Sequence, residues 1–377
     1  MDIYREHAKY FIEELPYLEK PYSKRNWGSK WHSLCSYHGK LKPSIAHLLV
    51  KTFTSKGDIV LDPLSGVGTI PFEACLQGRI GMGNDLSKLA YVVSKAKLNI
   101  PDRKEVDKIV EKLDIYIKDN WDKYDTYDLP YSNFGYNKTL IQYYESTTFK
   151  EIILSRDFFK KDPDISESEA VVMSSLLHVL HGNRPYALSR NSHPLTPYAP
   201  SGDFVYKNVI KHINNKLDIV YKDIPQDFTK GEMLFGDALN LHKKLDRKVD
   251  AIITSPPFAS SIKFYTHNWL RLWFSGWEEE DFKNAESTFL DSLQKTNLDI
   301  YKDFFYMANN VIKDGGKMIL HLGKSNKCDM AKELTSYAKQ YFDVIFIGNE
   351  DVSNREKHGV KDKGGTTHHQ FMFLHKR

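Results

Sequence analysis

The segment Thr254-Ser255-Pro256-Pro257-Phe258 holds residue types that could act on an aromatic amine. An exocyclic amino group on a base is a poor nucleophile, because its lone pair is delocalised into the ring. Two fixed acceptors that take its hydrogens would favour a pyramidal nitrogen with a usable lone pair. The Ser255 hydroxyl and the carbonyl of Ser255 or Pro256 could be these acceptors, and Phe258 could stack on a base that has left its duplex. We therefore predict a catalytic motif of Ser255, Pro256, Pro257 and Phe258, with a rigid Pro-Pro turn beside a buried Phe as the alternative.

A second group of residues predicts a cofactor-binding loop. Asp62-Pro63-Leu64-Ser65-Gly66-Val67-Gly68-Thr69 follows a short apolar run, and its two glycines would allow a tight turn and a close backbone approach. Asp85 ends the next apolar run, where an acid can accept hydrogen bonds from ribose hydroxyls. Asp237 ends a third run and could accept from an adenine amino group. The alternatives are a structural turn for the glycine loop, a helix N-cap for Asp85 and a turn residue after glycine for Asp237.

The glycine pattern of this loop favours S-adenosylmethionine over a dinucleotide. The loop reads Gly-x-Gly-Thr, whereas a pyrophosphate would need the longer Gly-x-Gly-x-x-Gly. Asp62 would repel a diphosphate, but it suits the cationic end of an amino-acid cofactor. We therefore predict S-adenosylmethionine as the cofactor. The contacts expected from this part of the chain are Asp62, Pro63, Ser65, Gly66, Gly68, Thr69, Asp85, Leu86, Asp237 and Ala238.

The elements that must position these motifs alternate as in a doubly wound sheet. Apolar runs predict buried strands, and a 3.6-residue apolar period predicts the helices between them. The expected strands are 59–61, 80–84, 233–235, 249–253, 317–322 (after a turn at 314–316), 344–347 and 371–374, and the expected helices begin at Pro43 or span 69–77 and 87–98. The last two strands predict a hairpin. The fold class is therefore α/β, a mostly parallel seven-stranded Rossmann-like sheet, with residues 1–100 and 231–377 as a discontinuous catalytic domain.

Residues 101–230 interrupt this pattern and predict a helical insert, a candidate target-recognition region. Its segment 181–194 combines cationic, amide and aromatic side chains that could contact phosphates or base edges. A loop that covers the active site or packs on the sheet is an equal alternative. The cations Lys207 and Lys211 are better explained as a solvated helix face. The candidate DNA contacts in the insert are Arg184, Tyr186, Arg190, Asn191 and His193.

Two of these motifs resemble those of a known family. The 62–69 loop looks like the cofactor motif of the amino-methylating DNA methyltransferases, except that Leu64 stands where the family usually has Phe. The 254–258 segment is similar to their catalytic motif in its N4-cytosine form, whereas N6-adenine enzymes more often have Asp or Asn in place of Ser255. The resemblance covers roughly residues 30–98 and 232–325. It implies a class I methyltransferase fold in which Tyr37 and Lys40 contact the methionine part of the cofactor, unless they are plain surface residues. Residues 264–270 could close the pocket or form an ordinary helix.

The resemblance implies a site-specific transfer of a methyl group from S-adenosylmethionine to N4 of cytosine in DNA. The target base would be flipped out, and a restriction or defence system could supply a cognate partner. N6-adenine methylation, methylation of RNA or of a protein amide, and a non-catalytic DNA-binding subunit with the same fold stay open as alternatives. Methylation at cytosine C5 is not expected, because that chemistry needs a nucleophilic cysteine, typically after proline, and no cysteine here follows a proline.

The bulk composition agrees with these expectations without deciding among them. The 377 residues carry a formal net charge of +4 and a pI near 8.6, which is compatible with a polyanionic partner. The three cysteines have no zinc or disulfide spacing, so we expect no metal site and a reducing compartment. No apolar run reaches the length of a membrane span, and the first residues lack the layout of a signal peptide. We therefore expect a cytoplasmic protein, and the resemblance implies that it is prokaryotic and nucleoid-associated.

Overall fold

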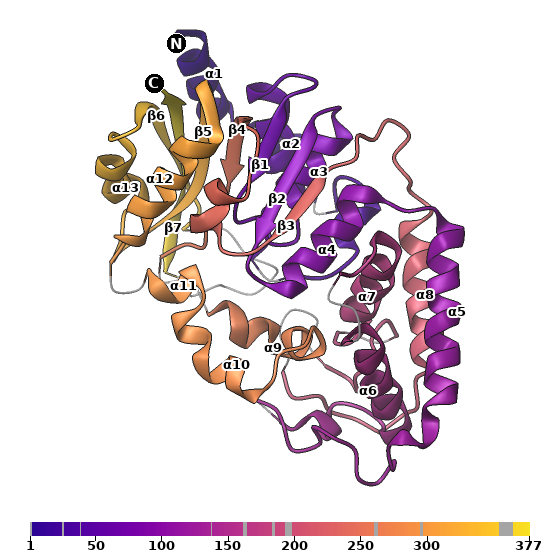
Figure 1. Ribbon diagram of the computed structural model, residues 1–377. Coiled ribbons are helices and arrows are strands. Elements are labelled where there is room, and N and C mark those ends of the chain that lie inside the picture. Colours follow the sequence, from indigo (N-terminus) through magenta and orange to yellow (C-terminus); the bar gives the residue numbers. More distant parts are fainter. Residues whose placement is uncertain are drawn as a thin grey trace.

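A computed structural model describes residues 2–24, 26–37, 39–136, 138–160, 164–182, 185–192, 198–259, 263–294, 297–353 and 365–377. Within these residues, seven strands form one sheet in the order β3-β2-β1-β4-β5-β7-β6 (Figure 1). Neighbours from β3 to β5 are parallel, and β7 is antiparallel to both β5 and β6. The strands are β1 (Ile59–Asp62), β2 (Ile80–Asp85), β3 (Glu232–Phe235), β4 (Val249–Thr254), β5 (Ile312–Ser325), β6 (Phe342–Asp351) and β7 (Thr366–Lys376). The expected mostly parallel sheet with a terminal hairpin is confirmed.

Helices cover the sheet and form a further layer beside it. Those of the N-terminal part are α1 (Asp2–Glu14), α2 (Pro43–Phe53), α3 (Thr69–Leu76) and α4 (Lys88–Asn99). The insert contributes α5 (Arg103–Asp119), α6 (Ser146–Lys160), α7 (Glu167–Val179) and α8 (Val209–Val220). The rest are α9 (Phe264–Phe274), α10 (Glu279–Asn284), α11 (Leu290–Leu293), α12 (Ile300–Val311) and α13 (Met330–Ala338). Pro43 starts α2 at its first turn, where a missing N–H costs nothing, as expected from the sequence.

Successive side chains along the central strands enter different layers of the protein. Val60 of β1 is buried with α1, α2 and α3 on one face, and Leu61 is buried with α12 and α13 on the other. In β4, Ile253 is buried in the same cluster as Val60, and Ile252 is buried in the same cluster as Leu61. Because both faces are covered, the central strands need apolar residues at nearly every position, which explains the continuous apolar runs.

The helical layer includes a segment that the sequence prediction placed in the catalytic domain. Helices α5 to α8 come from the predicted insert and lie beyond α4, on the opposite side from α12 and α13 (Figure 1). Helix α9, which follows β4, is buried in the same core as these helices. Its side chains are apolar around most of the helix, and a helix of this kind must be enclosed. The buried residues include Trp269, Leu270, Leu272, Trp273 and Phe274. Residues 264–270 therefore belong to a packed helix, and their role in closing the pocket stays a prediction.

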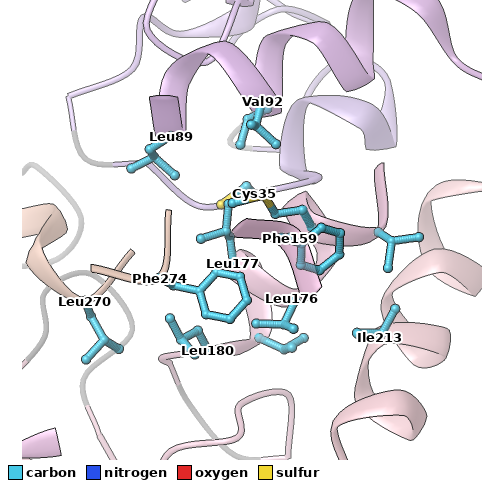
Figure 2. Close-up of a cluster of buried hydrophobic side chains, with 14 of the residues drawn as sticks. Cys35, Leu89, Val92, Phe159, Leu176, Leu177, Leu180, Ile213, Leu270 and Phe274 are labelled. Atoms are coloured by element: carbon cyan, nitrogen blue, oxygen red, sulfur yellow. The ribbon is translucent and has the colours of Figure 1, made fainter. Parts of the chain in front are cut away.

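One apolar cluster joins the helical layer to the sheet domain. Figure 2 shows side chains from the N-terminal segment and α4 meeting others from the helical layer. The labelled members are Cys35, Leu89, Val92, Phe159, Leu176, Leu177, Leu180, Ile213, Leu270 and Phe274. Truncating a buried leucine in such a cluster typically costs about 2–5 kcal/mol. The helical layer is therefore packed onto the sheet domain through a shared core.

The turn predicted at 314–316 is a bulge inside a strand. Strand β5 begins at Ile312, opposite Val249, and its pairing with β4 resumes at Lys317, opposite Ala251. Gly315 has a φ of 74°, a conformation that glycine adopts without a steric penalty.

Among the described residues, no helix is long and apolar enough to cross a membrane.

Candidate active site

The polar residues of the predicted site meet where the strand order of the sheet reverses. From β1 the chain continues to β2 and β3 on one side of the sheet, and β4 and β5 lie on the other. Ligands of such sheets bind beyond the carboxyl ends of the strands at this point. Asp62 ends β1 and Thr254 ends β4, and the Thr254 hydroxyl donates a 2.6 Å hydrogen bond to Asp62 Oδ1. The cofactor loop and the catalytic motif therefore leave the sheet side by side.

The glycine loop is held in place by Asp85. One carboxylate oxygen of Asp85 accepts from the Gly66 N–H at 2.9 Å, and the other accepts from the Ser87 N–H at 2.9 Å. Gly68 caps α3 with a φ of 67°, and a Cβ at this position would lie 2.8 Å from Ser94 Oγ. Ser94 in turn donates to the Gly66 carbonyl at 2.9 Å. The loop needs glycine at position 68 for both conformation and space.

A buried carboxylate, Asp62, and a half-buried one, Asp85, give this loop an affinity for positive charge. Burial raises the pKa of Asp62 to about 7, although hydrogen bonds from Thr254 and from the Leu64 N–H oppose the shift. Burial likewise raises the pKa of Asp85 to about 6. Within the described residues, neither carboxylate forms an ion pair with a basic side chain. A cationic amino group beside Asp62 would offset the free-energy cost of burying its negative charge. These residues therefore fit the amino-acid end of S-adenosylmethionine.

The residues beyond β3 mainly support the loops of the site. Asp237 accepts from the Leu239 N–H at 3.0 Å and from the Asn240 amide at 2.9 Å, so it caps a short 3-10 helix that begins at Ala238. The sequence alternative for Asp237 was a turn residue after glycine, whereas the structure shows a helix cap, and its contact with adenine stays a prediction. Sequence reasoning missed Asn84, whose fully buried amide donates to the carbonyls of Pro63 and Gly236. Asn84 thereby ties the loop after β1 to the end of β3.

The segment before the first strand places one of its two predicted residues at the cofactor loop. The ring of Tyr37 lies against Gly66, where an added Cβ would be 3.4 Å from Tyr37 Cε1. Burial and the nearby charges of Asp85 and Asp291 raise the pKa of Tyr37 well above its usual value, so the phenol stays neutral. The amine of Lys40 instead donates to the His32 carbonyl at 2.8 Å, inside its own segment. A contact between Lys40 and the cofactor stays a prediction without structural support.

The polar oxygens of the 254–258 motif include the Ser255 hydroxyl, the Pro256 carbonyl and the Pro257 carbonyl. Ser255 Oγ lies 2.9 Å from Nδ1 of His321 on β5. The Pro257 carbonyl accepts from the Gln294 amide at 2.9 Å, which holds the turn in place. Within the described part of the chain, the Pro256 carbonyl receives no hydrogen bond. Ser255 Oγ and the Pro256 carbonyl therefore remain candidate acceptors, and the Ser255 carbonyl stays an alternative to the latter.

Phe258 is packed among histidines that sequence reasoning did not single out. Its ring fills the space beside Gly323, where a Cβ would lie 2.5 Å from Phe258 Cγ. The ring centroids of His321 and His369 are 5.4 Å and 5.7 Å from that of Phe258. A signal for His321 was present in the sequence, since it is a single polar residue within the apolar run of β5. The stacking of Phe258 on a base stays a prediction.

The structure separates the predicted DNA contacts of the insert. Arg184 and His193 lie outside the described residues. Tyr186 is 63% exposed, and Asn191 is exposed while its backbone pairs with Ser201. These two residues stay candidates for contacts with DNA.

Two cations of the insert are used internally instead. The guanidinium of Arg190 donates to the carbonyls of Gly202 and Gln142 and lies 4.1 Å from the centroid of the Phe204 ring. These contacts hold a loop together and do not favour Arg190 as a phosphate contact. The Lys207 amine donates to the carbonyls of Ala187 and Ser189, so the prediction that it lies on a solvated helix face is wrong.

Comparison with known proteins supports the cofactor half of this site. Residues 30–121 match the RMKL-like methyltransferase domain family (UPF0020). The type II methyltransferase M.MjaII of Methanocaldococcus jannaschii is 29% identical to this chain over 79 residues, which are 21% of this chain and 15% of that enzyme. This aligned segment is a small part of the archaeal protein.

Two solved structures show a distant likeness. TrmN from Thermus thermophilus has a TM-score of 0.33 and 13% identity, over 92% of this chain and 52% of that one. The rRNA methyltransferase aviRa from Streptomyces viridochromogenes has a TM-score of 0.34 and 8% identity, over 91% of this chain and 88% of that one. A likeness of this degree carries no substrate from those proteins to this chain.

The strand order, the glycine loop and the matched family together define a class I S-adenosylmethionine-dependent methyltransferase domain. S-adenosylmethionine is the cofactor of this class. The family match ends before the catalytic motif at 254–258, so the methyl acceptor must be argued from the site.

Proposed function

We propose that this protein methylates the exocyclic N4 of cytosine at specific sites in DNA. The observation that carries the proposal is the placement of Ser255 Oγ and the Pro256 carbonyl at the carboxyl end of β4. The preceding residue, Thr254, contacts Asp62 at the end of β1. Two hydrogen-bond acceptors thus stand next to the loop that fits the cofactor.

Different residues of the site would bind the cofactor and the base. Asp62, Asp85 and Tyr37 would hold S-adenosylmethionine, which supplies an electrophilic methyl group on a positively charged sulfur. Ser255 Oγ and the Pro256 carbonyl would take the two hydrogens of the amino group. This pairing localises the nitrogen lone pair and orients it for attack.

Sequence resemblance, net charge and an exposed aromatic side chain support DNA as the substrate. The Ser-Pro-Pro-Phe motif is similar to the N4-cytosine form of amino methyltransferases, and the archaeal relative is named a type II methyltransferase. The chain has a net charge of +4, and the insert exposes Tyr186. A cognate restriction or defence partner belongs to the proposal through the resemblance alone. N6-adenine methylation of DNA is the second candidate, because the same two acceptors would serve an adenine amino group.

Expression in a host without DNA methylation tests the proposal. Nucleoside mass spectrometry and modification-sensitive sequencing should find N4-methylcytosine within one sequence motif. N6-methyladenine instead would select the second candidate, and methylation confined to RNA would overturn the choice of DNA. Ser255→Ala should abolish multiple-turnover methylation, leave only a small residual single-turnover rate, and leave cofactor binding in place. Ser336→Ala, which removes an exposed hydroxyl on α13, is the matched control and should methylate normally.

A further inference from the structure

We propose that His321 is a positioning residue that makes the Ser255 hydroxyl a dedicated hydrogen-bond acceptor toward the substrate. The inference rests on the proposed function for the nature of the substrate. A serine hydroxyl can donate or accept, whereas activation of an amino group requires it to accept. Ser255 Oγ lies 2.9 Å from His321 Nδ1. If Nδ1 carries no proton, the Ser255 hydroxyl must donate to it, and the Ser255 oxygen is left to accept from the substrate.

The surroundings of His321 favour a neutral ring. Its side chain is 4% exposed, and burial lowers its pKa well below the usual value, with a further decrease from the charge of His369. The nearby charged group on β6 is Glu350, and it interacts with His369 at 3.5 Å and accepts from the Tyr17 hydroxyl. Within the described residues, His321 itself has no acidic partner. A neutral imidazole has a single N–H, on one of its two nitrogens.

The aromatic packing around His321 is compatible with a proton on Nε2. Among the described residues, the buried Nε2 of His321 has no hydrogen-bond partner. The rings of His369 and Phe371 lie with their centroids 4.9 Å from that of His321, and Phe258 lies at 5.4 Å. The face of an aromatic ring carries partial negative charge, so it attracts an N–H and repels a nitrogen lone pair. In the proposed tautomer the proton is on Nε2, and Nδ1 is left as an acceptor for the Ser255 hydroxyl.

The Ser255 hydroxyl must then donate its proton to Nδ1. Its oxygen retains lone pairs that can accept from the substrate, as a carboxylate or amide oxygen would. With the Pro256 carbonyl, the site presents two acceptors and no donor. It would pair with the amino group of cytosine or adenine, whereas uracil and thymine would place a keto oxygen against these acceptors. His321 thereby contributes to the choice of an amino-bearing base.

A double-mutant cycle tests whether His321 acts through Ser255. His321→Phe retains a ring of similar volume among the neighbouring rings and removes Nδ1. It should slow single-turnover methyl transfer about 10- to 100-fold, the loss expected for one hydrogen bond of about 1.4–3 kcal/mol. Cofactor affinity should not change. In a Ser255→Ala background the same substitution should have no further effect, and independent multiplying losses would overturn the proposal.

A rescue variant and a matched control separate positioning from folding. His321→Asn can offer Oδ1 to the Ser255 hydroxyl and should recover much of the lost rate. His375→Phe changes a histidine near the other end of β7, opposite Lys317, and should leave the rate unchanged. Thermal melting should show that all three variants fold. Equal rates for His321→Phe and His321→Asn would contradict the proposal that residue 321 accepts a hydrogen bond from the Ser255 hydroxyl.

Nuclear magnetic resonance provides a readout without substrate or cofactor. In protein labelled with 15N-histidine, His321 should show protonated Nε2 and unprotonated Nδ1 from pH 8 down to pH 6. A proton on Nδ1, or a charged ring at pH 7, would overturn the inference. If the expected tautomer is found but no methylated DNA is detected, the proposed function fails and the relation between His321 and Ser255 stands.

Discussion

The hydroxyl of Thr254 donates a 2.6 Å hydrogen bond to the carboxylate of Asp62, and both side chains are buried. Thr254 directly precedes Ser255, and Asp62 begins the glycine loop. A single contact thus couples the strand that ends at the catalytic motif to the strand that ends at the cofactor loop. The same bond partly counters the rise in the pKa of Asp62 that burial causes.

Replacing Thr254 by Val should weaken cofactor binding by about 10- to 100-fold at pH 7. The substitution keeps the shape of the side chain and removes one hydrogen bond to a charged group, worth about 1.5–3 kcal/mol. The pKa of Asp62 should rise further, so the pH at which binding is half-maximal should move upward. Isothermal titration calorimetry with S-adenosylmethionine at several pH values measures both effects. Thr335→Val, on α13, removes a hydroxyl that donates to the Ala331 carbonyl and should leave binding unchanged.

Asp62 should make the cofactor-free protein less stable as the pH rises. Its folded-state pKa of about 7 lies above the ordinary value of 3.8, so the folded state holds the proton more tightly. This contribution to stability is fully present below pH 4 and is lost as the pH rises through 7. Asp62→Asn should therefore increase the free energy of unfolding on the order of 2–4 kcal/mol more at pH 8 than at pH 4. Urea denaturation at the two pH values measures the difference.

The same variant should bind S-adenosylmethionine at least tenfold more weakly at pH 8, because the carboxylate that faces the cationic group is lost. Asp58→Asn, on the exposed turn before β1, is the control, since Asp58 accepts a hydrogen bond from the Ser55 N–H in solvent. An unchanged pH dependence in Asp62→Asn would show that Asp62 is not the group that titrates.

Gly68→Ala should disrupt the cofactor loop. The left-handed backbone at a φ of 67° costs an alanine about 1–2 kcal/mol, and its Cβ would lie 2.8 Å from Ser94 Oγ. Moving Ser94 would break its bond to the Gly66 carbonyl, so cofactor affinity should fall together with the melting temperature. Gly57→Ala is a matched control, because Gly57 has a φ of 85° and nothing within 4 Å of an added Cβ. It should lower stability alone, and a similar loss of cofactor affinity in both variants would refute the loop argument.

Tyr186 and Arg190 should respond differently to truncation. Tyr186→Ala removes an exposed ring and should weaken DNA binding several-fold, with the melting temperature unchanged. Arg190→Ala removes the guanidinium that bonds to the carbonyls of Gly202 and Gln142, so the helical insert should lose stability. Fluorescence anisotropy with duplex DNA and thermal melting measure the two properties. Weaker DNA binding by the Arg190 variant at full stability would restore Arg190 as a DNA contact.

Local chemistry made much of the sheet domain predictable. Apolar runs such as Val249–Ile253 predict strands that are buried on both faces, whatever their neighbours are. The glycines at 66 and 68 predict a turn, because their backbone conformations are open to few other residues. The positions of Asp62 and Asp85 at strand ends follow from the same runs. The order of the elements along the chain then predicts the α/β class.

The helical layer was less predictable, because apolar residues do not specify their partners. Helix α9 was assigned to the catalytic domain by its place after β4, yet Trp269 and Trp273 are buried in the core of the insert. Arg190 and Lys207 looked like candidates for a solvated or DNA-binding surface. Their donors are instead satisfied by backbone carbonyls of loops that only the folded chain brings near.

By itself, the sequence determined which residues could do the chemistry and at which strand ends they stand. Only the tertiary structure decided what each of them contacts. Asp62 and Thr254 are 192 positions apart, and Ser255 and His321 are 66 apart. They meet because β4 pairs with β1 on one side and with β5 on the other. Strand pairing joins segments that are distant along the chain, and the hydrogen-bond partner that sets the pKa or the polarity of a side chain depends on that pairing.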